Sequence, residues 1–136
     1  MDIIETINKI NETYEYVYDT YGFAYGKPDP NETFMSGFCY EYFNILHRFF
    51  PSAKLMMQND KMHCAALIDD DIYDVTGLRC DKLNFHEATG ADIEYIYKRF
   101  GMFPLGFKDI LNICLRKNML IKSNCYTKKR KKQPQI

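Results

Sequence analysis

The sequence predicts an α+β fold, in which a helix that carries a cysteine packs on a small antiparallel sheet flanked by further helices. Two kinds of pattern lead to this prediction. Apolar residues recur at helical spacing in four stretches, and short apolar stretches bounded by turn residues lie between the second and the third of them. The helical stretches are 2–20, 36–50, 91–100 and 107–120, and the strand stretches are 53–57, 62–68 and 72–75. Helices and strands that occupy separate parts of the chain are typical of the α+β class.

The first two helices are bounded by residues that start or stop helices. In 2–20, isoleucine, tyrosine and valine recur at helical spacing with polar residues between them. Glycine and proline within 22–32 predict a loop. The next helix, 36–50, has Ser36 as its expected N-cap, and Pro51 ends it.

The register of the predicted hairpin decides which side chains meet. The strands 62–68 and 72–75 are joined by three aspartates at 69–71. A turn of two residues places the side chains of His63 and Asp74 on the same face of the sheet, as diagonal or near-diagonal neighbours. A turn of three residues places them on opposite faces.

The chain returns to helices after the hairpin. The segment 78–90 has no clear period, and we expect irregular structure that covers the sheet. Helical spacing resumes at 91–100, is broken by Gly101 and Pro104, and resumes again at 107–120.

Length and composition favour one domain. The chain has 136 residues and 46% of them are hydrophobic, so it is large enough to bury a core of its own. We place this domain at 1–122 and a basic tail at 123–136. The tail includes Lys128 to Lys132, which are five of the eighteen basic residues, so the rest of the chain is acidic. We expect a disordered, solubilising tail, with contact to a nucleic-acid backbone as the alternative.

Composition also argues against membrane, secreted and zinc-binding classes. No apolar run is long enough to cross a bilayer, and the acidic start of the chain lacks the layout of a signal peptide. The five cysteines are odd in number and irregularly spaced, which disfavours a disulfide framework or a zinc site. We therefore expect a cytoplasmic protein with no membrane contact, no metal and no cofactor.

The most informative residues are Cys39, His63 and Asp74, in that order along the chain. Cys39 lies in the first turn of the second helix, where the helix dipole and free backbone N–H groups favour a thiolate. His63 opens an apolar strand, where a buried imidazole needs a polar partner, and Asp74 on the return strand can supply it. A nucleophilic thiol needs a base and a residue that orients the base, so these side chains predict a catalytic site. We expect the backbone N–H of Cys39 and the side chain of Asn31 to stabilise an oxyanion.

Less specific interpretations of these residues stay open. Cys39 taken alone fits a buried core position. His63 taken alone fits a structural hydrogen bond with Asp74 or an exposed place at the strand edge. Cys64 alternates with His63 along the strand, so we expect it to face away from the site and into the packing.

Three stretches also carry a family resemblance. They are Gly-Phe-Cys-Tyr-Glu-Tyr-Phe at 37–43, His63 with the apolar strand that it opens, and Ile-Tyr-Asp-Val-Thr-Gly at 72–77. Together they resemble the papain-like cysteine-hydrolase superfamily and are most similar to its small transglutaminase-like and NlpC/P60-like members. The resemblance implies a papain-like fold, with Cys39 as nucleophile, His63 as base and Asp74 as the residue that orients the imidazole.

These observations lead to one expected function and one alternative. We expect a cysteine-nucleophile enzyme that performs acyl transfer or amide hydrolysis on a protein or peptide, as a protease, a deamidase or a transglutaminase. The alternative is a catalytically silent, papain-like binding module that inhibits or occludes a protein partner. Small size and composition suggest a phage or mobile-element protein.

Overall fold

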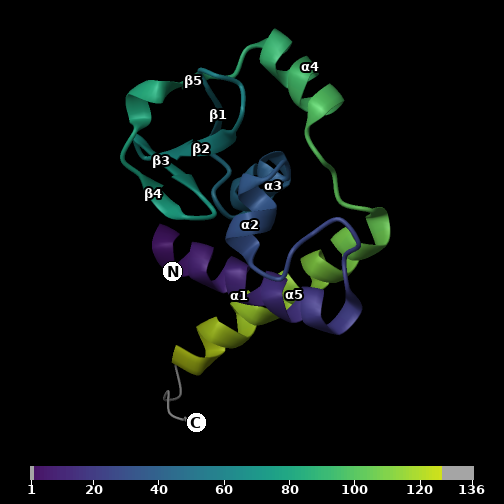
Figure 1. Cartoon of the computed structure of the whole chain (residues 1–136). Coiled ribbons are helices and arrows are strands. Elements are labelled where there is room, and N and C mark those ends of the chain that lie inside the picture. Colours follow the sequence, from purple (N-terminus) through teal and green to yellow (C-terminus); the bar gives the residue numbers. More distant parts are fainter. Residues whose placement is uncertain (1, 127–136) are drawn as a thin grey trace.

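The computed structural model describes residues 2–126, with side chains as far as residue 119. It has the expected α+β class, with helices packed on one small antiparallel sheet (Figure 1). The helices are α1 (Ile3–Tyr21), α2 (Pro30–Met35), α3 (Cys39–Phe49), α4 (Gly90–Arg99), α5 (Leu105–Tyr126) and the short 3-10 helix Lys82–Asn84. The strands are β1 (Lys54–Gln58), β2 (Cys64–Ile68), β3 (Asp71–Asp74), β4 (Gly77–Arg79) and β5 (Phe85–Glu87). Most of the expected tail, 127–136, lies outside the described residues, as does the run Lys128 to Lys132.

The five strands lie in the order β4-β3-β2-β1-β5, and every neighbouring pair is antiparallel. In the β2–β3 hairpin, Ile68 pairs with Asp71, so the turn consists of Asp69 and Asp70 alone. Both turn residues have positive φ angles, 51° and 71°, and aspartate tolerates this left-handed conformation better than most residues. The two-residue turn is therefore the correct alternative.

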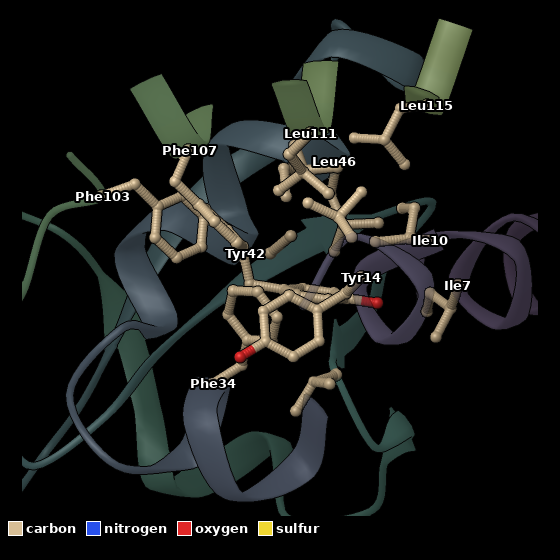
Figure 2. Packing of buried hydrophobic residues seen from close by; sticks show 14 of the residues in the cluster. Ile7, Ile10, Tyr14, Phe34, Tyr42, Leu46, Phe103, Phe107, Leu111 and Leu115 are labelled. Carbon is tan, nitrogen blue, oxygen red and sulfur yellow. The ribbon is translucent and has the colours of Figure 1, made fainter. Parts of the chain in front are cut away.

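Helix α3 is central, because it lies between the sheet on one side and the crossed pair α1 and α5 on the other (Figure 1). Its inner face belongs to an aromatic core, which Figure 2 shows from close by. The ring of Phe34 packs edge-on against Tyr14 and Tyr42, at centroid distances of 5.1 Å and 4.8 Å. The large core is thus built from helices α1, α2, α3 and α5 against one face of the sheet.

A chain of hydrogen bonds ties α3 to the hairpin. The hydroxyl of Tyr42 donates to Asn11 Oδ1 at 2.8 Å, and Asn11 Nδ2 donates to the carbonyl of Val75 at 3.0 Å. Val75 directly follows β3, so these contacts fix the distance between the α3 helix and the end of the hairpin.

Several elements differ from those expected from the sequence. The predicted loop contains α2, which Asp29 caps by accepting a hydrogen bond from the backbone N–H of Asn31, with Pro30 at the first helical position. Ser36 is the C-cap of α2 and not the N-cap of α3. The pair Asp29-Pro30 is a local start signal for a helix, whereas the glycines and prolines around it favour a loop.

The segment 78–90 is more ordered than expected. It contributes most of β4 and all of β5, and β5 pairs with β1, which precedes it by almost thirty residues along the chain. Such short edge strands lack a period of their own and are stabilised by their partner. Within the described residues, no helix is both long and apolar enough to cross a membrane.

Candidate functional site

Cys39 is the first residue of α3, two residues after Gly37. Gly37 precedes it with a φ of 112°, which a residue with a side chain rarely adopts, and its carbonyl accepts a hydrogen bond from Gly101 at 2.7 Å. This turn directs the thiol into the protein, where it is 3% exposed. The N-terminus of a helix favours negative charge, so Cys39 lies where a thiolate is stabilised.

His63 and Asp74 form a buried pair. His63 Nε2 lies 2.8 Å from Asp74 Oδ2, and the two residues are 4% and 3% exposed. The pairing follows from the hairpin register, because a two-residue turn puts both side chains on one face, two positions apart. His63 itself immediately precedes β2, which begins at Cys64.

Asp74 is held by four hydrogen-bond donors. Its Oδ1 accepts from the backbone N–H of Thr76 at 2.8 Å and from the Thr76 hydroxyl at 2.5 Å. Its Oδ2 accepts from Arg79 Nη1 at 2.9 Å as well as interacting with His63. Burial raises the pKa of Asp74, but the hydrogen bonds from His63 and Thr76 outweigh burial and lower it below its ordinary value. The carboxylate is therefore ionised and fixed in orientation.

The thiol and the imidazole stabilise each other's charged forms. Hydrogen bonding from Cys64 and interaction with His63 lower the pKa of Cys39 to about 5, against the opposing effect of burial. Burial lowers the pKa of His63, but hydrogen bonding to Asp74 and interaction with Cys39 raise it to about 9. Between these values the pair is a thiolate and an imidazolium.

The second ring nitrogen of His63 is the one left for the thiol. Nε2 is occupied by Asp74, while Nδ1 is buried and has no hydrogen bond of full geometry among the described residues. An unsatisfied buried nitrogen costs about 1–3 kcal/mol, so a purely structural role of His63 does not explain why Nδ1 has no partner. The arrangement can transfer a proton between Nδ1 and a group that reacts at Cys39.

Cys64 lies in the site, which contradicts the expectation that it faces away. Its Sγ lies 3.4 Å from Cys39 Sγ, and its backbone N–H also donates to that sulfur at 3.4 Å. Alternation along the strand was predicted correctly, since Cys64 packs with Met57 on the helix side of the sheet. Cys64 nevertheless contacts Cys39, because α3 packs on the helix side of β2 and Cys64 is the first residue of that strand.

Helix α4 covers the thiols. Its fully buried Ile96 packs in one cluster with Cys39, Met57 and Cys64. The residues around Cys39 and His63 leave no space large enough for a water molecule. A substrate therefore requires some part of this cover to move.

Polar contacts hold α4 in place at the sheet. Thr89 and Asp92 form a capping box at its N-terminus. Asp92 also interacts with His86 Nε2 at 2.7 Å and with Lys61 Nζ at 3.6 Å. These are surface or part-buried contacts, in contrast to the apolar packing of Ile96.

The structure does not bring Asn31 to the site. Its side chain is exposed on the first turn of α2, and within residues 2–126 it makes no hydrogen bond with Cys39. Sequence reasoning also missed Arg79, whose signal was its place five residues after Asp74 in a second tight hairpin. Among the described residues, no three His, Cys, Asp or Glu side chains are placed to hold a metal ion.

Comparison with known proteins identifies a family of a different kind from the one expected. A family model described as Phage YunG-like protein matches residues 6–113, a span that includes Cys39, His63 and Asp74. No curated protein matches the chain, and no solved structure matches it. The family's description agrees with the expectation of a phage protein.

The expected membership of the papain-like superfamily is wrong, because the family shown for the chain is Phage YunG-like and no papain-like or transglutaminase-like family is shown. The order of three residues was weak evidence for ancestry. A thiol, an imidazole and a carboxylate can be brought together on unrelated folds, so such a set is defined by geometry and not by family.

Proposed function

The chain belongs to the Phage YunG-like protein family, and we propose that it is a cysteine-nucleophile enzyme that performs acyl transfer or amide hydrolysis on a protein or peptide. One observation carries the proposal. His63 is hydrogen-bonded through Nε2 to a fixed carboxylate, its other nitrogen, Nδ1, is buried without a hydrogen-bond partner among the described residues, and Cys39 lines the same enclosed space as His63. This is the arrangement that an activated thiol needs.

Each residue of the site has a role in the proposed reaction. The Cys39 thiolate attacks the carbonyl carbon of the acyl donor, and the His63 imidazolium gives its proton to the leaving group. The neutral imidazole then takes a proton from water or an amine, which resolves the acyl-enzyme. Asp74 orients the ring, and the free backbone N–H groups at the start of α3 stabilise the oxyanion.

A purely structural role explains the site less well. A buried hydrogen-bonded pair can be replaced by apolar residues of similar shape at little cost, whereas an unsatisfied nitrogen is a continuing cost. Here the pair is present, Nδ1 has no hydrogen-bond partner among the described residues, and Cys39 lines the same enclosed space. Perturbed titration of several adjacent groups in one place is typical of functional sites.

A catalytically silent binding module is the second candidate. It is favoured by the closed site, since Cys39 is almost inaccessible and α4 lies over it. In that case the three polar residues hold the hairpin to α3, and the protein acts by covering a partner's surface.

The test is acylation by an activated ester. We expect p-nitrophenyl acetate to acetylate Cys39, as located by peptide mass spectrometry, with release of nitrophenolate. The rate should rise with pH through about 5 as the thiolate forms, and fall through about 9 as the imidazolium is lost. His63→Ala should remove the alkaline limb and slow the reaction by about 10²-fold or more, as expected for loss of a general acid–base.

Matched controls come from the same chain. Cys80→Ser removes an exposed thiol and His47→Ala an exposed imidazole on α3, and neither should alter the rate. Absence of acetylation at Cys39 in folded protein, at every pH, would overturn the enzymatic proposal and leave the binding module.

A further inference from the structure

The site contains a second thiol that the proposed reaction does not use. Cys64 is fully buried, and its S–H group donates to Cys39 Sγ at 3.4 Å. The backbone N–H of Cys64 donates to the same sulfur, so Cys64 contacts Cys39 Sγ through both its side chain and its backbone. A hydroxyl or an amide would be enough to donate a hydrogen bond to the Cys39 sulfur and lower its pKa. A thiol can in addition be oxidised, which those groups cannot.

We propose that Cys64 is a resolving cysteine, so that oxidation of Cys39 by a peroxide ends in a Cys39–Cys64 disulfide that reversibly blocks the nucleophile. The inference builds on the reactive Cys39 of the proposed function. It adds a modification site and a form of regulation to it.

The reaction has two balanced steps. The Cys39 thiolate attacks one oxygen of the peroxide, the O–O bond breaks, and the leaving hydroxide or alkoxide takes a proton from the His63 imidazolium, so that the products are Cys39 sulfenic acid, neutral His63 and water or an alcohol. The Cys64 sulfur then attacks the Cys39 sulfur, the S–O bond breaks, and the thiol proton leaves with the hydroxyl as water. The two sulfurs together lose two electrons, which the peroxide accepts.

The geometry favours closure over further oxidation. The two sulfurs need to approach by about 1.4 Å to reach a disulfide bond length near 2.05 Å, starting from 3.4 Å. No other atom has to be displaced from between them, because the S–H group of Cys64 already points at Cys39. Hydrogen bonding to Cys39 and burial raise the pKa of the Cys64 thiol, so it waits as a neutral thiol until Cys39 has been oxidised.

The packing of α4 over the two thiols sets the rate at which a peroxide can oxidise Cys39. Both thiols are buried under Ile96, and there is no room for a water-sized oxidant in the closed site. A peroxide therefore reaches Cys39 through the same movement that admits a substrate. Once formed, the disulfide protects the nucleophile from irreversible oxidation to sulfinic or sulfonic acid.

Peptide mass spectrometry of the full-length protein treated with hydrogen peroxide tests the inference. We expect a crosslinked Cys39–Cys64 peptide as the main product and loss of two of the five thiols of the chain. Iodoacetamide labelling of Cys39 should disappear and return fully after dithiothreitol. In Cys64→Ser, Cys39 should instead reach sulfinic or sulfonic acid, and dithiothreitol should not restore labelling.

Controls separate this inference from a folding defect. Cys80→Ser, which removes an exposed thiol, should form the crosslink as the natural chain does. Cys64→Ala serves as a second variant, and circular dichroism reports whether each variant is folded. The crosslink in the unaltered protein needs no variant at all.

The outcomes also separate it from the enzymatic proposal. A crosslink in a protein that is never acetylated at Cys39 supports the redox inference and overturns only the acyl-transfer chemistry. Acetylation of Cys39 without a crosslink, or irreversible oxidation of Cys39 while Cys64 stays a free thiol, overturns the resolving role.

Discussion

Helix α3 contributes residues to two apolar clusters, the aromatic core and the site cluster around Cys39, and the two clusters are built differently. The aromatic core joins α1, α2, α3 and α5 and is filled with large rings in contact with one another. The site cluster contains four buried residues, Cys39, Met57, Cys64 and Ile96. Only one of these four comes from α4, whose other contacts are polar ones at its N-terminal end, the part-buried ring of Tyr95 and the contact of exposed Tyr97 with Tyr40.

Because of this difference, the stability of the domain and the accessibility of the Cys39 thiol depend on different residues. Burial of large rings contributes most of the free energy of folding, so the aromatic core sets the global stability. An element with few buried apolar contacts opens locally at a lower free energy than the whole domain. We therefore expect α4 to move away from the thiols while α3 and the core remain folded.

Truncation in the aromatic core should have the largest effect on stability. Phe34→Ala removes a fully buried ring that contacts Tyr14 and Tyr42. We expect it to lower the free energy of unfolding by about 3–5 kcal/mol. Ile96→Ala in the site cluster should cost about 2 kcal/mol, at the lower end of the range for such substitutions. Urea unfolding followed by circular dichroism measures both, and equal losses would contradict the separation of the two regions.

Access to the thiol should respond in the opposite way. Ile96→Ala removes the most deeply buried apolar contact between α4 and the site cluster, so opening becomes easier. We expect iodoacetamide labelling of Cys39 to be about tenfold faster, which corresponds to ~1.4 kcal/mol in the opening equilibrium. Ile10→Ala is the matched control, because Ile10 is equally buried but lies in the aromatic core. Equal acceleration in both variants would show that labelling needs global unfolding.

The thiolate–imidazolium pair predicts a specific dependence of stability on pH. In the unfolded chain the ordinary pKa values are about 8.5 for cysteine and about 6.5 for histidine. In the folded chain they are about 5 for Cys39 and about 9 for His63. The lowered pKa of Cys39 adds stability that is lost as pH falls through about 5, and the raised pKa of His63 adds stability that is lost as pH rises through about 9.

The two contributions cancel in the middle of the range. From pH ~6.5 to ~8.5 the folded and unfolded pairs bind the same number of protons, so we expect a plateau. Between pH ~5 and ~6.5 stability should rise by at most about 1.4 kcal/mol per pH unit. Cys39→Ser removes the acidic limb and leaves a decline above pH ~6.5 from His63 alone. Urea unfolding of both proteins from pH 5 to 9 measures the difference, and parallel profiles would contradict the ion pair.

The smallest expected effect concerns the support of Asp74. Arg79 Nη1 donates to Asp74, while its Nε and Nη2 bond to Asp81 at 2.9 Å and 2.7 Å. A lysine cannot make these three directed contacts, so we expect Arg79→Lys to cost about 1 kcal/mol of stability. Thr76 still holds the other oxygen of Asp74, so the labelling rate of Cys39 should not change. A large fall in that rate would give Arg79 a more direct part in the site.

The residues of the candidate site were predictable where local rules decide their position. Cys39 in the first turn of a helix follows from a helical period, and the pairing of His63 with Asp74 follows from a two-residue turn, which was one of the two turn lengths that the sequence left open. Their catalytic roles remain predictions. Asn31 lies near Cys39 along the chain, but it belongs to the unexpected helix α2 and its side chain is exposed, so proximity in sequence did not give a contact with Cys39 within the described residues.

The amino-acid sequence by itself determined the α+β class, a helix with Cys39 in its first turn, and a hairpin that carries His63 and Asp74 on its two strands. These depend on the period of the apolar residues and on turn residues, which act over a few positions. The length of the turn was left open by the sequence and is two residues in the structure. Only the tertiary structure decided that Cys64 contacts Cys39, that β5 pairs with β1, and that Ile96 covers the site. Each of these contacts joins residues at least twenty-five positions apart, and distant contacts depend on how the elements pack together.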